Sequence, residues 1–249
     1  MAPARRRGAA AAAGRRLLLP ALLATAAAAS PAGSAAPERT IPSGFVGVSV
    51  ETNGVADYAA TPAVREAYVN VLAALQGCFH APGEACVGGR LRIGGNSADR
   101  TAWMPDGSGP ADLPANATVA FTPALAQQVQ AIAEGTNGTI VWDLNLAGLG
   151  PAWGVRFVEG LRDATGFARV AGIEIGNEVD LYHSNGYREL HYGFKHYVAE
   201  WLAYCEALQA AGVVPAAAFV QAATYTSRCH GCRAEVRTAA PLLADLGTC

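Results

Sequence analysis

The first 37 residues of the sequence contain no acidic residue. They contain five arginines before position 17 and then a mostly apolar run from Leu17 to Ala29. That run is shorter than the roughly 20 apolar residues of a membrane span, so no stable membrane anchor is expected. A basic start, a short apolar run and small residues between Ala29 and Ala36, where cleavage is expected, predict a secretory signal peptide over residues 1–36.

An organelle transit peptide is the alternative, because such peptides are also rich in Arg and Ala. The contiguous apolar run favours secretion, so the mature protein is expected outside the cell or in the endolysosomal or vacuolar lumen. Six cysteines fit disulfides formed in an oxidising compartment. Two N-glycosylation motifs, which begin at Asn116 and Asn137, agree with this location.

The cysteine pattern gives little support to a metal or redox site. Cys229 and Cys232 have the spacing of half a metal site, but no second Cys or His pair has a matching spacing. A structural disulfide is therefore the favoured interpretation, and Cys78 and Cys86, which bracket a loop, could form a local one. No metal and no cofactor are expected.

The sequence also lacks an excess of basic residues. Removing the leader takes away five arginines and no acid, which moves the formal net charge from −2 to −7. Such a chain gives no electrostatic help to polyanions, so a nucleic-acid partner is not expected. No glycine-rich phosphate loop follows a predicted strand, which argues against a nucleotide-binding sheet.

The mature chain alternates short strands with amphipathic helices. Segments that are short, partly β-branched and bounded by Gly or polar residues predict strands over residues 45–50, 91–93, 139–145, 170–175 and, more weakly, 217–223. Apolar residues at helical spacing predict helices from Thr61-Pro62 to Gly77, from Thr122-Pro123 to Gly135, from about Trp153 to Gly166, and from about Tyr187 to Ala211.

This alternation predicts an α/β fold with parallel strands and right-handed crossovers. The pattern alone leaves a barrel and an open doubly wound sheet as alternatives. A complete eight-stranded barrel typically needs about 250 residues. Only about five strands can be counted in residues 37–249, so a barrel would be truncated after about five strands.

Polar residues follow each predicted strand. Examples are Glu51, Asn96, Asn145 and Glu178. In a barrel the carboxyl ends of the strands and the loops after them carry the working residues. Carboxylates and amides gathered at one open end of a barrel, with Trp103 and Trp142 expected nearby, are typical of a carbohydrate cleft.

Glycoside hydrolysis needs two carboxyl groups across the scissile bond. One of them stays protonated near the working pH, donates its proton to the leaving oxygen and later acts as a base. Glu178, directly after Asn177 at a strand end, suits that role. The alternative is a solvated loop glutamate with no catalytic function.

Four segments resemble the β-glucuronidase/heparanase group, glycoside hydrolase family 79, in order and spacing. They are Gly44–Glu51, Leu91–Asp99, Asp143–Leu146 and Ile173–Tyr182, and the similarity runs from about Ile41 to Thr226. The Gly-Gly-Asn-Ser segment and the extended Gly-Asn-Glu segment are the most specific of these.

The resemblance implies a retaining mechanism on a (β/α)8 TIM barrel, of which residues 37–249 would be the first part. It implies that Glu178 is the acid/base and that Asn177 contacts the sugar. It further implies that Glu51, Asn96, Ser97 and Asn145 line the subsite for the terminal sugar, with a carbohydrate as the partner. For the last four residues, hydrogen bonds to loop backbone groups are the alternative role, and for Asp99 loop ordering is favoured over sugar binding.

Two departures from the family pattern bear on activity. Val179 stands where the family usually has proline after the Asn-Glu pair. The family's nucleophile, a Glu near the end of the seventh strand, has no counterpart, and neither has its C-terminal β-sandwich. The sequence thus predicts either a β-glucuronidase-like enzyme without its nucleophile or an inactive carbohydrate-binding protein. Exo action is favoured over a heparanase-like one because the chain is acidic.

Overall fold

The structure, a computed structural model, describes residues 45–75, 88–106, 108–214 and 218–225, all of which fall in the compact unit Ile41–Cys249. The predicted signal peptide and the pairs Cys78/Cys86 and Cys229/Cys232 lie outside the described residues. Cys205 is disulfide-bonded. Within the described part, no helix is long and apolar enough to cross a bilayer.

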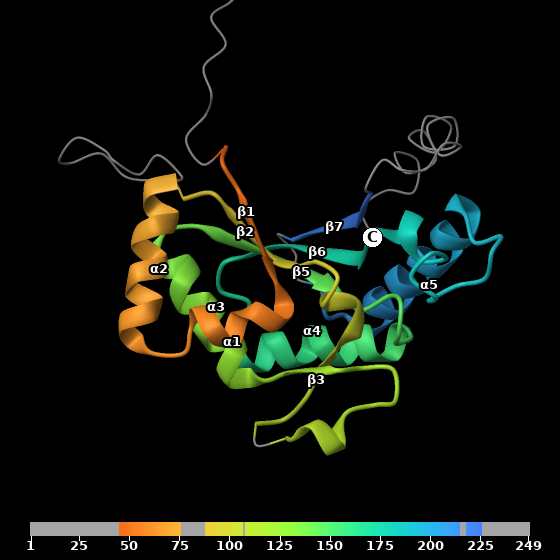
Figure 1. The fold of residues 1–249 in the computed structure, drawn as a ribbon, viewed down its shortest axis with the longest axis horizontal. Coiled ribbons are helices and arrows are strands. Elements are labelled where there is room, and N and C mark those ends of the chain that lie inside the picture. The colour runs from red at the N-terminus through yellow and green to blue at the C-terminus, as the bar shows by residue number, and fades with distance from the viewer. Residues whose placement is uncertain (1–44, 76–87, 107, 215–217, 226–249) are drawn as a thin grey trace, which may run out of the picture. The chain divides into compact units, whose positions relative to one another are not determined.

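The central element is a parallel sheet with the strand order β1-β2-β5-β6-β7 (Figure 1). Its strands are β1 (Val48–Glu51), β2 (Arg90–Gly94), β5 (Thr139–Leu144), β6 (Val170–Asn177) and β7 (Phe219–Thr224). The spatial order follows the chain without the reversal that defines a doubly wound sheet. The α/β fold is therefore as predicted, and the five-stranded sheet is compatible with part of a barrel; the complete barrel stays a prediction.

Helices connect the strands, and each of the longer ones packs on the next (Figure 1). The α-helices are α1 (Val55–Tyr58), α2 (Pro62–Leu75), α3 (Pro123–Gly135), α4 (Pro151–Thr165) and α5 (Phe194–Ala211). Short 3-10 turns are η1 (Thr52–Gly54), η2 (Ala98–Arg100), η3 (Pro110–Asp112) and η4 (Val179–Leu181).

The helix ends that the structure describes are largely as predicted, and the end predicted at Gly77 lies outside the described residues. The Thr61 and Thr122 hydroxyls accept hydrogen bonds from Val64 N and Leu125 N, as N-capping residues do. Gly166 ends α4 in the left-handed conformation that favours glycine.

The two faces of the sheet differ in polarity because side chains alternate along each strand. Leu91, Ile93, Trp142 and Ile173 share one face and belong to the hydrophobic core, which the helices cover. Arg92 and its neighbours in register lie on the opposite face. The site described below is built on that polar face.

Two expectations from the sequence are wrong, and one pair of strands was missed. The helix predicted from Tyr187 begins only at Phe194, because the chain turns where the Arg188 guanidinium donates to the carbonyls of Leu146 and Ala147. Trp103 and Trp142 do not line a cleft; both are buried with Phe157 in the core. A small parallel pair, β3 (Thr101–Trp103) and β4 (Val119–Phe121), was not predicted.

Candidate active site at the carboxyl edge of the sheet

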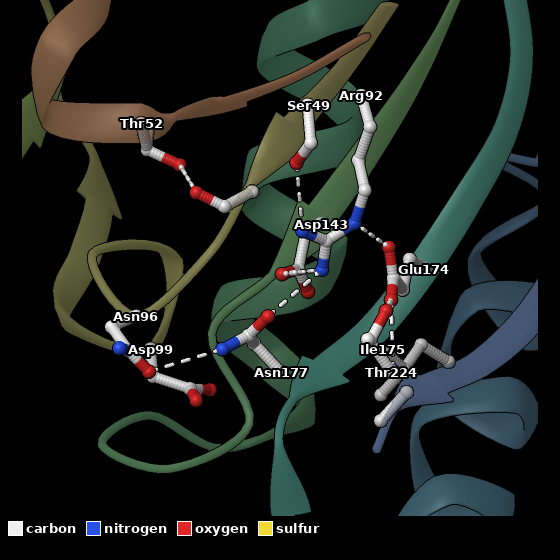
Figure 2. A network of polar contacts seen from close by, with 12 residues as sticks. Ser49, Thr52, Arg92, Asn96, Asp99, Asp143, Glu174, Ile175, Asn177 and Thr224 are labelled. Carbon is white, nitrogen blue, oxygen red and sulfur yellow. Dashed lines mark hydrogen bonds and ion pairs between the residues drawn. The ribbon is translucent and has the colours of Figure 1, made fainter. Parts of the chain in front are cut away.

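A network around Arg92 crosses the polar face of the sheet (Figure 2). The Arg92 Nε donates to Glu174 Oε2 at 2.5 Å, and one terminal nitrogen donates to Asp143 Oδ2 at 3.0 Å. The same nitrogen donates to Asn177 Oδ1 at 3.0 Å, and the other donates to the Ser49 hydroxyl at 3.2 Å. One guanidinium thereby ties strands β1, β2, β5 and β6 together.

The network holds two buried carboxyl groups against one cation. The side chains of Asp143 and Glu174 have no exposed surface. Burial, together with the negative charges of Glu174 and Asp99, raises the pKa of Asp143 well above its usual value, although Arg92 opposes the shift. Glu174 is further held by the backbone N–H and hydroxyl of Thr224.

Asn177 is fixed between this network and the loop after β2. Its Oδ1 accepts from Arg92, and its Nδ2 donates to Asn96 Oδ1 at 3.1 Å (Figure 2). Gly176 precedes it with φ +85, a conformation that L side chains rarely adopt. The alternation of side chains between the two faces of the sheet stops there. The Asn177 side chain therefore points to the polar face, and the residue is 4% exposed.

Glu178 differs from every acid in the network. It directly follows β6 and takes a left-handed backbone conformation (φ 46, ψ 47). Its side chain is half-buried, and no described residue forms a hydrogen bond or ion pair with it. A non-glycine residue held in this region costs on the order of 1 kcal/mol or more, and such residues cluster at functional sites. Glu178 is thus a carboxyl group presented at the sheet edge without a protein partner among the described residues.

Glu51 organises the neighbouring loop. Its carboxylate accepts from Asn96 N at 3.1 Å, Ser97 N at 2.9 Å and the Ser97 hydroxyl at 2.5 Å. A Cβ at Gly95 would meet this carboxylate at 2.3–2.6 Å, so only glycine permits the approach. The structure therefore brings Glu51, Asn96, Ser97 and Asn177 to one edge, where Asn96 is exposed.

Asn145 lies at the same edge, but its amide is engaged with backbone groups. Its Nδ2 donates to Thr101 O at 3.0 Å, and its Oδ1 accepts from Gly148 N at 2.8 Å. These bonds correspond to the loop-ordering alternative. A sugar contact from Asn145 stays a prediction.

Asp99 joins three of the loops that follow the strands. Its Oδ1 accepts from the Tyr182 hydroxyl at 2.6 Å and from Ala147 N at 3.2 Å. Burial raises the pKa of Asp99 to about 7, and hydrogen bonds from Tyr182 and from the backbone of Ala147, Leu146 and Asn177 oppose the shift. Asp99 is 2% exposed, so it orders loops as expected rather than facing a ligand.

Arg92, Glu174 and Tyr182 were missed as site-building residues. The available signal was a charge in the middle of an apolar strand, in Leu91-Arg92-Ile93 and again in Ile173-Glu174-Ile175. Since buried charges are almost always paired, two such strands should have suggested an ion pair. Among the described residues, no group of three or more His, Cys, Asp or Glu is placed to hold a metal ion.

No protein-family model and no curated protein matches the sequence. Among solved structures, one similar chain is a 4-O-α-L-rhamnosyl-β-D-glucuronidase from Fusarium oxysporum 12S in complex with Rha-GlcA. It is 18% identical with a TM-score of 0.42, and the match covers 66% of this chain and 35% of that one. A similarity of this degree does not establish a shared fold, and the chain spans about a third of that protein's length.

Proposed function

We propose that this chain carries the acid/base side of a glycoside hydrolase active site, with Glu178 as the proton donor and acceptor. The observation that supports it is the Glu178 carboxyl group, strained in its backbone and unpartnered among the described residues, next to an immobilised Asn177. β-Glucuronides are the proposed substrates, because the four segments that resemble glycoside hydrolase family 79 supply this edge of the sheet.

The chemistry follows from the position of each group. Glu178 in its protonated form donates to the leaving glycosidic oxygen, and as a carboxylate it then removes a proton from the attacking water. Asn177 and Asn96, which are bonded to each other, offer their remaining amide hydrogens and lone pairs to sugar hydroxyls. The Arg92 network holds Asn177 in place while these bonds form.

The second carboxylate of a retaining mechanism lies roughly 5–5.5 Å from the first. In the described part of the chain, Glu51, Asp99, Asp143 and Glu174 each accept hydrogen bonds from protein groups. Asp99, Asp143 and Glu174 are buried, and the exposed Glu51 is held by hydrogen bonds from Asn96 and Ser97. The proposed nucleophile is therefore not one of these four groups.

This observation favours a second candidate function, a carbohydrate-binding protein without turnover. It would use the exposed Asn96 and the half-buried Glu178, beside the buried Asn177. It requires no second carboxylate.

One experiment separates the two functions. The full chain is assayed with methyl and 4-nitrophenyl β-glucuronides, beside Glu178→Gln and, as a matched control, the exposed Glu189→Gln. For the hydrolase, Glu178→Gln should lower kcat/KM for the methyl glycoside by about 10²–10⁴-fold, as expected for lost general acid catalysis. The nitrophenyl glycoside, whose leaving group needs little protonation, should lose less.

The possible outcomes are distinct. Equal activity of wild type and Glu178→Gln on the methyl glycoside removes Glu178 from the acid/base role. No turnover by the wild type, with calorimetric binding of glucuronate that Asn177→Ala abolishes, supports the binding protein instead. Neither turnover nor binding would contradict both proposals.

A further inference from the structure

A separate pocket is lined by the loops that follow β2, β5 and β6 and by the segment that precedes β4. Its volume is about 310 Å³, at the lower end of the range for small-ligand sites. Its lining includes Arg100, Asn116, Thr118, Gly148 and Tyr187, and neither Glu178 nor Asn177 belongs to it. The segment that carries Asn96 and Ser97 continues directly into this lining, so the pocket borders the candidate active site.

The pocket presents one cation with free donors. The Arg100 Nε donates to the Tyr187 hydroxyl at 2.7 Å, and the guanidinium lies 5.6 Å from the centre of the Tyr187 ring. Among the described residues, no acceptor binds the two terminal nitrogens of this exposed arginine. A planar guanidinium held at one nitrogen can offer its remaining N–H groups in parallel to a carboxylate or sulfate.

The rest of the lining is suited to a sugar. Tyr187 provides an aromatic ring, Thr118 provides an exposed hydroxyl, and Gly186 has open space around its Cα. The frame is also fixed, because the Arg100 carbonyl accepts from Thr118 N at 2.8 Å. The shape and polarity thus resemble a small carbohydrate subsite rather than an apolar ligand pocket.

We propose that this pocket binds an acidic sugar unit, bearing a carboxylate or sulfate, with Arg100 as the residue that recognises the negative charge. The proposal rests on the proposed function, since it places a second, acidic unit of the same carbohydrate beside the candidate active site.

The one acid in the lining does not cancel the charge of Arg100. Asp99 turns its carboxyl group toward Tyr182 and Ala147, and it is almost fully buried. Burial raises its pKa to about 7, so below that pH it is largely neutral. The local charge of the pocket is therefore positive, in contrast to the acidic chain as a whole.

The test is an NMR titration of the full ¹⁵N-labelled chain with sodium glucuronate, glucose and glucose 6-sulfate at pH 6. The amide signals of Gly148 and Gly186 report on the pocket, and that of Gly95 reports on the candidate active site. Glucuronate or the sulfate ester should shift Gly148 and Gly186 with a dissociation constant at least about fivefold lower than that of glucose. Which of the two anions binds more tightly identifies the acidic group.

Two variants test whether Arg100 causes the preference for acidic sugars. Arg100→Gln should weaken binding of the acidic sugar about fivefold and leave glucose unchanged, whereas Arg162→Gln, an exposed arginine of α4, should change neither. Equal binding of glucose and both acidic sugars, or no effect of Arg100→Gln, overturns the proposal. Shifts of Gly95 without shifts of Gly148 and Gly186 also overturn it but leave the proposed function standing. The opposite pattern supports the pocket and counts against the proposed function.

Discussion

Glu174 lies within β6 and Glu178 directly follows the strand, four residues later and in the opposite environment. Glu174 is completely buried and accepts hydrogen bonds from Arg92 and from two donors of Thr224. The Glu178 side chain is half-buried and has no hydrogen-bonding or ionic partner among the described residues. A buried carboxylate whose charge is matched by a cation and by hydrogen-bond donors holds strands together. A carboxylate at a sheet edge without such partners is available to a ligand. The same type of side chain is thus tied into the sheet at Glu174 and left without a partner at Glu178.

Removing the compensating cation should have the largest effect on stability. Arg92→Met leaves Asp143 and Glu174 buried without a positive charge, which should lower the free energy of unfolding by about 3–5 kcal/mol. Urea unfolding at pH 7 measures this. Arg162→Met is the control, because its ion pair with Asp163 is exposed and should contribute under about 0.5 kcal/mol.

A second variant tests the cause. Adding Glu174→Gln to Arg92→Met removes one of the stranded charges and should recover part of the loss. If the double variant is as unstable as the sum of the single ones, the loss comes from packing rather than from uncompensated charge.

The pH dependence of stability should show a smaller effect, through Asp99. Its pKa is about 7 in the folded protein and 3.8 as a model value, so the folded state binds its proton more tightly. The stability contributed by that proton is complete below about pH 4 and is lost as the pH rises through 7. The shift of roughly three units bounds the loss at about 4 kcal/mol.

Comparing variants isolates this contribution. Asp99→Asn keeps an acceptor for the Tyr182 hydroxyl but does not titrate, so its stability should fall less than that of the wild type between pH 4 and 8. Asp163→Asn, which changes an exposed carboxylate, should follow the wild type. Parallel curves for wild type and Asp99→Asn would show that Asp99 titrates normally.

Much of this arrangement could be predicted from the sequence, and the failures have physical reasons. Glu51 and Asn177 end parallel strands and Asn96 lies two residues after one, so the three residues must come to one edge, because carboxyl ends of parallel strands coincide. The sequence contains no comparable rule for which donor satisfies which carboxylate. Asn145 has the type of side chain that binds sugars, but its amide forms hydrogen bonds with Thr101 O and Gly148 N.

Local pattern was also misleading where tertiary contacts decide the structure. Tyr187 and Leu190 have helical spacing with the residues of α5, but Leu190 is 67% exposed and the helix starts only at Phe194. The three-residue strands β3 and β4 are too short for any periodicity to show. Their pairing depends on loops brought together by the sheet.

The smallest expected effect concerns the strained backbone of Glu178. At φ 46 an L side chain is disfavoured, whereas glycine is not. Glu178→Gly should therefore raise the free energy of unfolding by about 0.5–1 kcal/mol, although it removes the carboxyl group. Glu178→Gln retains the strain and should gain no stability. Glu189→Gly, at an exposed residue without positive φ, should gain none either.

If Glu178→Gly is less stable than Glu178→Gln, the side chain contributes to folding, and the contrast with Glu174 disappears. A gain confined to Glu178→Gly would mean that the fold carries this carboxyl group at a cost, which is expected of a residue kept for binding or catalysis rather than for stability.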